Sequence, residues 1–232
     1  MSSSRWRCSK VLKATTTVSS LLISFLTLSA QADAEREFIV DEFDSVKVSQ
    51  GITLNLVMGN SPSVNAMAAN DRDLDRLEIE VDDGVLEIRR GSWVAGFFSM
   101  GQSHGSVTVN VVASELEALV SSSGANADLT GIACDDLTID ASSGSRIEAS
   151  GRCDTVVIDA SSGAVVDSRD LMTAEAMVDS SSGASIKVFA GESFRGDASS
   201  GSSVRVYGSP EMAESTTSSG ARIDMRGHEQ TI

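Results

Sequence analysis

The tripeptide Ser-Ser-Gly occurs six times in the second half of this 232-residue chain, at an almost constant spacing. Its glycines follow one another at intervals of 18 to 20 residues: Gly124, Gly144, Gly163, Gly183, Gly201 and Gly220. A flexible linker would not keep such a period. The repeat therefore indicates a structural unit of about 19 residues that stacks on copies of itself.

Apolar and polar residues alternate on both sides of each glycine. Three residues after it, the chain always has an apolar residue: Ala127, Ile147, Val166, Ile186, Val204 and Ile223. Four residues before it, four of the repeats carry an acid: Asp140, Asp159, Asp179 and Asp197. A period of two is typical of strands with one buried face. Each unit is therefore predicted to form two short strands around Ser-Ser-Gly, followed by about six residues of turn.

A unit of this kind cannot bury its apolar face alone, whereas a stack of units encloses a continuous interior. We therefore predict an all-β fold, a single-stranded parallel β-helix (β-solenoid) with coils of about 19 residues. The glycines are expected at corners that need a positive φ or close packing between coils. The serine before each glycine is expected to face inward, and the earlier serine outward.

The segments "VKVSQGITLNL" and "LEIEVDDGVLEI" are weaker versions of the same pattern. We therefore expect the solenoid domain to cover residues 33–232, with degenerate coils over 36–112 and regular repeats over 113–227. The alternative is a small β-sandwich that precedes the solenoid.

Residues 1–32 have the pattern of a secretory signal peptide, with a basic start, an apolar run and Ala-Gln-Ala before residue 33. The apolar run is too short to span a bilayer comfortably, so no integral membrane span is expected after cleavage. Cleavage leaves 14 Lys and Arg against 33 Asp and Glu, a net charge of about −19. This charge argues against nucleic acid as a partner. A periplasmic, secreted or cell-surface location is expected.

Cys134 and Cys153 are the cysteines that remain after cleavage, and they are 19 residues apart. Equivalent positions on neighbouring coils lie about 5 Å apart, which is within the range of a disulfide. An exported protein can form this bond. Alternatively, the two thiols are stacked in the core as small apolar groups.

No catalytic residue is expected, and neither is a cofactor. The chain lacks a Gly-x-Ser-x-Gly motif, and its two histidines, His104 and His228, cannot serve six equivalent serine pairs. The acids Asp140, Asp159, Asp179 and Asp197 should form an outward column. This column is either a solvated face or, as the alternative, the site of a Ca²⁺-dependent or polysaccharide-acting enzyme.

Residues 91–105 contain no charged side chain. They are the candidate ligand-binding or partner-binding loop through four apolar residues: Trp93, Phe97, Phe98 and Met100. Alternatively, the loop covers part of the solenoid. The expected partners are a glycan or an envelope protein, or a second copy that associates through the solenoid ends, where strand edges are open.

The segments "FDSVKVSQGITLNLVMGN" and "VTVNVVASELEALVSSSGA", together with the "SSGA" and "SSGS" blocks, resemble the putative auto-transporter adhesin, head GIN domain family. The resemblance covers residues 38 to 226. It implies an exported bacterial β-helical protein of unassigned biochemical function, with no catalytic residues to transfer. We therefore expect a non-enzymatic, adhesin-like binding protein of the cell envelope or surface.

Overall fold

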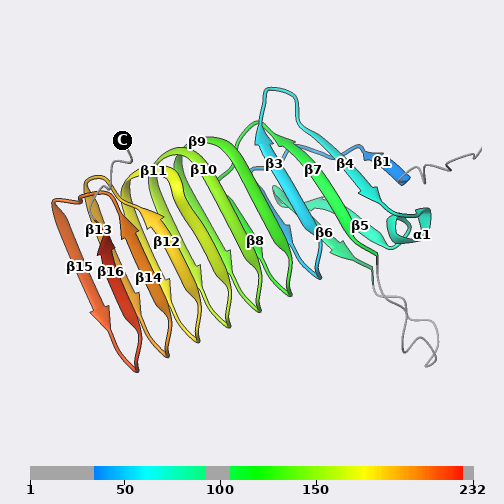
Figure 1. Ribbon diagram of the computed structural model, residues 1–232. Coiled ribbons are helices and arrows are strands. Elements are labelled where there is room, and N and C mark those ends of the chain that lie inside the picture. The colour runs from blue at the N-terminus through cyan, green and yellow to red at the C-terminus, as the bar shows by residue number, and fades with distance from the viewer. Residues whose placement is uncertain (1–33, 92–104, 227–232) are drawn as a thin grey trace, which may run out of the picture. The chain divides into compact units, whose positions relative to one another are not determined.

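Successive Ser-Ser-Gly units lie on one another in parallel register in the computed structural model, which describes residues 34–91 and 105–226 (Figure 1). The three longest strands make up the middle of the stack: β9 (Asn126–Ala141), β10 (Arg146–Ala160) and β11 (Val165–Ser180). Asp159 on β10 pairs with Asp140 on β9 and with Asp179 on β11. The predicted all-β class and parallel solenoid are confirmed.

Each Ser-Ser-Gly corner is a tight turn with two consecutive residues in the left-handed region. Between β10 and β11, Ser162 has a φ of 52° and Gly163 a φ of 73°. The Ala164 N–H donates to the Ser161 carbonyl over 3.0 Å, and this i to i+3 bond closes a type I′ turn. The Gly163 N–H donates to the Ser182 carbonyl on the next coil over 3.1 Å. The corners therefore extend the hydrogen-bond ladder from coil to coil.

The corner glycines are explained by backbone conformation and not by close packing. A Cβ built on Gly163 would have no other atom within 4 Å, and the same holds at the other five Ser-Ser-Gly corners. Glycine populates a positive φ without the steric penalty that a Cβ brings. The sequence allowed two explanations for these glycines, a positive φ or close packing between coils, and only the positive φ applies.

The predicted orientation of the serines was wrong. The serine before each glycine is exposed, as at Ser162, and the earlier one is half-buried, as at Ser161, except in the last repeat, where Ser218 is exposed. The residue after the glycine points inward instead, as shown by buried Ala164 and Ser145. Side chains alternate only along an extended backbone. Two left-handed residues break that alternation, so the period of two cannot be extended through the turn.

The predicted six-residue turns are also absent from the middle coils. β9, β10 and β11 are continuous strands of 15 or 16 residues that bend while staying paired. The pairing between β9 and β10 shifts in register between Ala149 and Gly151. A Cβ on Gly151 would collide with the main chain of Ile132 on the preceding coil. This glycine is explained both by the close approach of two backbones and by its φ of 135°, which residues with a side chain rarely adopt.

The last coils are made of shorter strands, stacked as two columns. One column contains β12 (Ser185–Phe189), β14 (Ser203–Tyr207) and β16 (Arg222–Arg226). The other contains β13 (Ser193–Ala198) and β15 (Met212–Thr217). All of these neighbours pair in parallel.

The N-terminal strands are not stacked in the order of the sequence. The strands that continue the parallel stack are β2 (Ser45–Val48), β3 (Thr53–Met58), β6 (Val85–Arg90), β7 (Val107–Ala113) and β8 (Ala118–Ser121). β2 pairs with β6 and β8, while β3 pairs with β7 and β9. The coil formed by β2 and β3 therefore lies between strands that follow it much later in the chain.

Antiparallel strands complete this end of the solenoid. They are β1 (Ala34–Phe38), β4 (Ser63–Ala68) and β5 (Leu77–Asp82), and the short helix α1 (Asp71–Leu74) connects β4 to β5. β4 pairs with β1 and β7, and β5 pairs with β6. This arrangement replaces the expected succession of degenerate coils over 36–112. Alternation predicts a buried face, but it does not specify the direction in which strands pair.

The interior is a continuous column of Leu, Ile, Val and Ala side chains. Ile139, Ile158 and Val178 stack at one level on three successive coils. Within residues 34–91 and 105–226, no helix is long and apolar enough to cross a membrane.

Candidate binding surface

Ten neighbouring strands of the sixteen-stranded sheet form one long side of the solenoid, in the order β1-β4-β7-β3-β9-β10-β11-β12-β14-β16, and we call this part the ten-stranded sheet. Its strands place one outward polar side chain each at the same level, which is four residues after the corner glycine in the regular coils. In strand order these are Glu37, Asn65, Asn110, Asn55, Asp128, Glu148, Asp167, Lys187, Arg205 and Asp224. The row thus begins with an acid and three amides, continues through three acids to the cations Lys187 and Arg205, and ends on Asp224.

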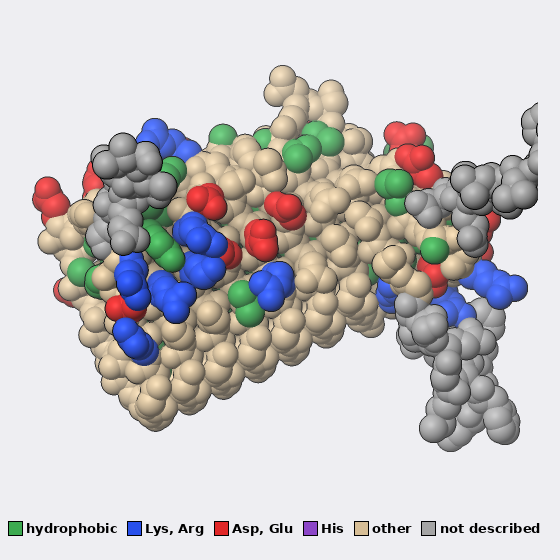
Figure 2. Space-filling view, viewed as in Figure 1, with side chains coloured by type: hydrophobic (Ala, Val, Ile, Leu, Met, Phe, Trp, Pro, Cys, Tyr) green, Lys and Arg blue, Asp and Glu red, His purple; other side chains and the backbone are tan. Residues whose placement is uncertain are grey.

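Cations and aromatic rings gather at the C-terminal end of this sheet, where Figure 2 shows blue side chains close to one another. Phe189 on β12 pairs directly with Tyr207 on β14, and Tyr207 pairs with Arg226 on β16. Both rings are half-buried. We call this region the cation–aromatic surface, and it consists of Arg169, Lys187, Phe189, Arg205, Tyr207, Arg222 and Arg226.

Asp167 joins the cations at one side of the surface. Its carboxylate accepts hydrogen bonds from Arg169 Nη2 over 2.7 Å and from Lys187 Nζ over 2.8 Å. Partial burial raises the pKa of Asp167, but the hydrogen bonds and charges of Arg169 and Lys187 outweigh burial and hold the pKa below its ordinary value. Asp167 is therefore ionised at neutral pH and fixes both cations in place.

The other side of the surface is organised by Asp224, which lies 2.9 Å from Arg226 Nη2 and 3.4 Å from Arg222 Nη2. Arg205 lies between the two acids and forms no ion pair with any described residue. The five cations exceed Asp167 and Asp224 by three charges, and Asp170 is a further acid that, after Asp167, contributes to raising the pKa of Arg169. Lys187 and Arg205 are direct neighbours across β12 and β14, and like charges in this position repel.

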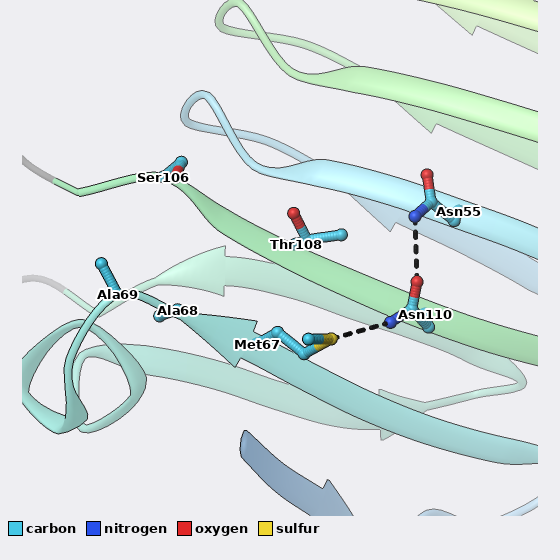
Figure 3. Close-up of a pocket in the computed structure, with 7 residues that line it drawn as sticks. All are labelled: Asn55, Met67, Ala68, Ala69, Ser106, Thr108 and Asn110. Atoms are coloured by element: carbon cyan, nitrogen blue, oxygen red, sulfur yellow. Dashed lines mark hydrogen bonds between the residues drawn. The ribbon is translucent and has the colours of Figure 1, made fainter. Parts of the chain in front are cut away.

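At the other end of the sheet, a neutral polar pocket of about 310 Å³ lies over β3, β4 and β7 (Figure 3). Asn55 Nδ2 donates to Asn110 Oδ1 over 2.9 Å, and Asn110 Nδ2 lies 3.6 Å from Met67 Sδ. The remaining lining residues are Ala68, Ala69, Ser106 and Thr108. The described lining carries no charge, so this pocket suits neutral polar groups.

The predicted acidic column lies on the other long side of the solenoid. Its four members are exposed and in register on successive coils: Asp140, Asp159, Asp179 and Asp197. Partial burial, followed by repulsion from Asp159 and Asp197, raises the pKa of Asp179. The described part of the chain contains no group of three or more His, Cys, Asp or Glu side chains arranged to hold a metal ion.

Cys134 and Cys153 form a disulfide between β9 and β10, with their Cα atoms 4.7 Å apart. The bond links neighbouring coils at equivalent positions. It lies outside the cation–aromatic surface, and its role is structural.

Several residues singled out in the sequence lie outside the described residues. They are the signal-peptide segment 1–32 and the loop residues Trp93, Phe97, Phe98 and Met100. The candidate role of this loop stays a prediction.

Sequence reasoning missed the cation–aromatic surface. Lys187 and Arg205 occupy equivalent positions of neighbouring repeats, and so do Phe189 and Tyr207, two residues further on. Aligning the outward positions of successive repeats would reveal this surface, because parallel stacking brings equivalent residues side by side.

The fold and its long polar sheet define the class of this protein: a β-solenoid that displays ordered rows of side chains. The model of the family described as putative auto-transporter adhesin, head GIN domain, matches residues 42–210. The chain belongs to this family.

Solved structures agree with this fold. A putative adhesin from Bacteroides fragilis NCTC 9343 has a TM-score of 0.67 and 11% identity, covering 85% of this chain and 98% of its own. A putative adhesin from Parabacteroides distasonis ATCC 8503 has a TM-score of 0.53 and 15% identity, covering 85% and 96%. At these identities the likeness concerns the fold alone. No curated protein matches the sequence.

Proposed function

We propose that this protein is an exported, non-enzymatic binding module of the bacterial cell envelope or surface. The observation that carries the proposal is the ten-stranded sheet, with its continuous outward polar row and the cation–aromatic surface at one end. Backbone ladders fix the spacing of these side chains at about 4.8 Å per strand, which is preorganised for an extended partner. Membership of an adhesin family supports the same function.

The proposed route to the envelope is export with removal of residues 1–32, which leaves the protein in the periplasm or at the surface. The mature net charge of about −19, from 14 cations and 33 acids, keeps the protein soluble and disfavours nucleic acid as its partner. The loop with Trp93 and Phe98 is proposed as an additional contact on the strength of its uncharged, aromatic composition.

A glycan array probed with the mature protein, residues 33–232, tests the proposal. We expect retention on a defined subset of glycans, without release of new reducing ends from the bound polysaccharides. The Trp93→Ala variant measures the contribution of the loop in the same assay. Turnover of a polysaccharide would contradict the non-enzymatic function, and so would retention on no glycan together with no binding to isolated envelope material.

A further inference from the structure

The cation–aromatic surface is the part of the molecule whose charge differs most from the rest. The mature chain has 33 acids against 14 cations, yet five cations and two acids meet here. These cations are spread over four neighbouring strands, β11, β12, β14 and β16, and Figure 2 shows a group of Lys and Arg side chains, with acids beside them, at this end of the molecule. A local positive excess within an acidic protein concentrates anionic partners at one place.

The arrangement of the cations favours an anionic ligand group at Arg205. Asp167 and Asp224 each form ion pairs with two cations, while Arg205, which is in register with Asp224 on β16, forms no ion pair with any described residue. Arg205 is also in register with Lys187 on the neighbouring strand, and like charges on paired residues repel. A carboxylate or sulfate bound between them would relieve this repulsion, and Arg can bind such a group through two parallel hydrogen bonds.

The aromatic pair favours a sugar over a simple ion as the ligand of this surface. Phe189 and Tyr207 are paired on adjacent strands, at the level two residues beyond Lys187 and Arg205. Half-buried rings offer a flat apolar surface, and the Tyr207 hydroxyl adds a polar group at its edge. A sugar ring with an acidic substituent presents the same combination of an apolar face and an anionic edge.

We propose that the cation–aromatic surface binds an anionic polysaccharide, with its acidic groups on Arg205 and Lys187 and its sugar rings on Phe189 and Tyr207. This inference rests on the proposed binding function and names the class of ligand. The rows of side chains run across the strands, so a linear chain contacts several coils at once. Nucleic acid is the weaker candidate, because its dense phosphate charge would also meet the acids that cover the rest of the protein.

Titration calorimetry with the mature protein tests the inference, using polygalacturonate, dextran sulfate, neutral dextran and a single-stranded DNA oligomer as probes. We expect binding to at least one of the two anionic polysaccharides, weakening as salt is added, and no binding to neutral dextran. Arg205→Gln should weaken binding about tenfold, the size expected for a charge-assisted contact. Tyr207→Ala should weaken it by a similar factor.

Arg195→Gln is the matched control. Arg195 is exposed on β13, on the opposite long side, and pairs with Glu214 over 2.7 Å. Its loss should change the affinity less than twofold, and far-ultraviolet circular dichroism with thermal melting should show that all three variants are folded. Equal weakening by Arg195→Gln would overturn the assignment to this surface. Tighter binding of DNA than of either polysaccharide would overturn the ligand class.

The two proposals fail in distinguishable ways. Array binding that is insensitive to Arg205→Gln and Tyr207→Ala would overturn this inference and leave the binding function standing. Absence of binding to every glycan and to envelope material would overturn both.

Discussion

Replacing Gly163 by alanine perturbs the corner conformation on which the stacking depends. Gly163 has a φ of 73°, and a Cβ there would touch no other atom within 4 Å. The cost is therefore conformational, about 1–2 kcal/mol for an L-residue in the left-handed region. For a domain of this size, each kcal/mol lowers the melting temperature by about 2–4 °C. Gly163→Ala should therefore melt about 2–8 °C below the parent protein.

Two substitutions in the same turn serve as controls, all measured by thermal melting of the mature protein. Ser162→Asn should leave the melting temperature unchanged or raise it, because Ser162 has a φ of 52° and Asn-Gly is the preferred type I′ pair. Ser161→Ala, outside the left-handed region, should change stability by less than about 0.5 kcal/mol. An unchanged melting temperature for Gly163→Ala would refute the left-handed corner.

Three further variants test other parts of the account. Gly151→Ala should destabilise more than Gly163→Ala in the same melting assay, because its Cβ would collide with the main chain of Ile132; an equal or smaller loss would contradict the close approach of the coils. Replacing both Cys134 and Cys153 by serine should lower the free energy of unfolding by about 2–4 kcal/mol in urea titrations, as expected for a bond that closes a loop of this length; no loss would argue against the disulfide. Asp179→Asn should stabilise the protein at pH 7, because burial and neighbouring acids raise the folded-state pKa of Asp179 above its unfolded value. That gain should shrink as the pH falls through the carboxyl range, where Asp179 is protonated in the parent, and a gain that grows on acidification would contradict the repulsion.

The stack of coils could be predicted from the sequence because the repeat period and the alternation of apolar and polar residues both follow from the geometry of stacked strands. Parallel stacking brings residues one period apart side by side, which is why the disulfide and the acidic column could be placed from spacing alone. The inward position of Val166 and its equivalents followed from alternation. These predictions needed only an extended backbone.

The predictions failed where the backbone is not extended or where strands pair out of order. The two left-handed residues at each corner, such as Ser162 and Gly163, shift the alternation, so the serines point the other way. The parallel insertion of β2 between β6 and β8 depends on contacts between segments distant in the chain. Local alternation carries no information about such partners.

The cation–aromatic surface could not be predicted from the net charge of the chain. Net charge averages over the chain, and an average of about −19, from 14 cations and 33 acids, concealed a local excess of cations. Only the alignment of outward positions shows that Lys187 and Arg205 are neighbours, with Phe189 and Tyr207 beside them.

The central claim is that the cation–aromatic surface is the binding surface, and Tyr207 is placed to report on it. It is the only tyrosine of the chain, so labelling with 3-fluorotyrosine gives the mature protein a single fluorine resonance at that surface. The account predicts that this resonance shifts or broadens during titration with a bound anionic polysaccharide, and stays unchanged with neutral dextran. Binding detected by calorimetry while the Tyr207 resonance remains unchanged would contradict the claim.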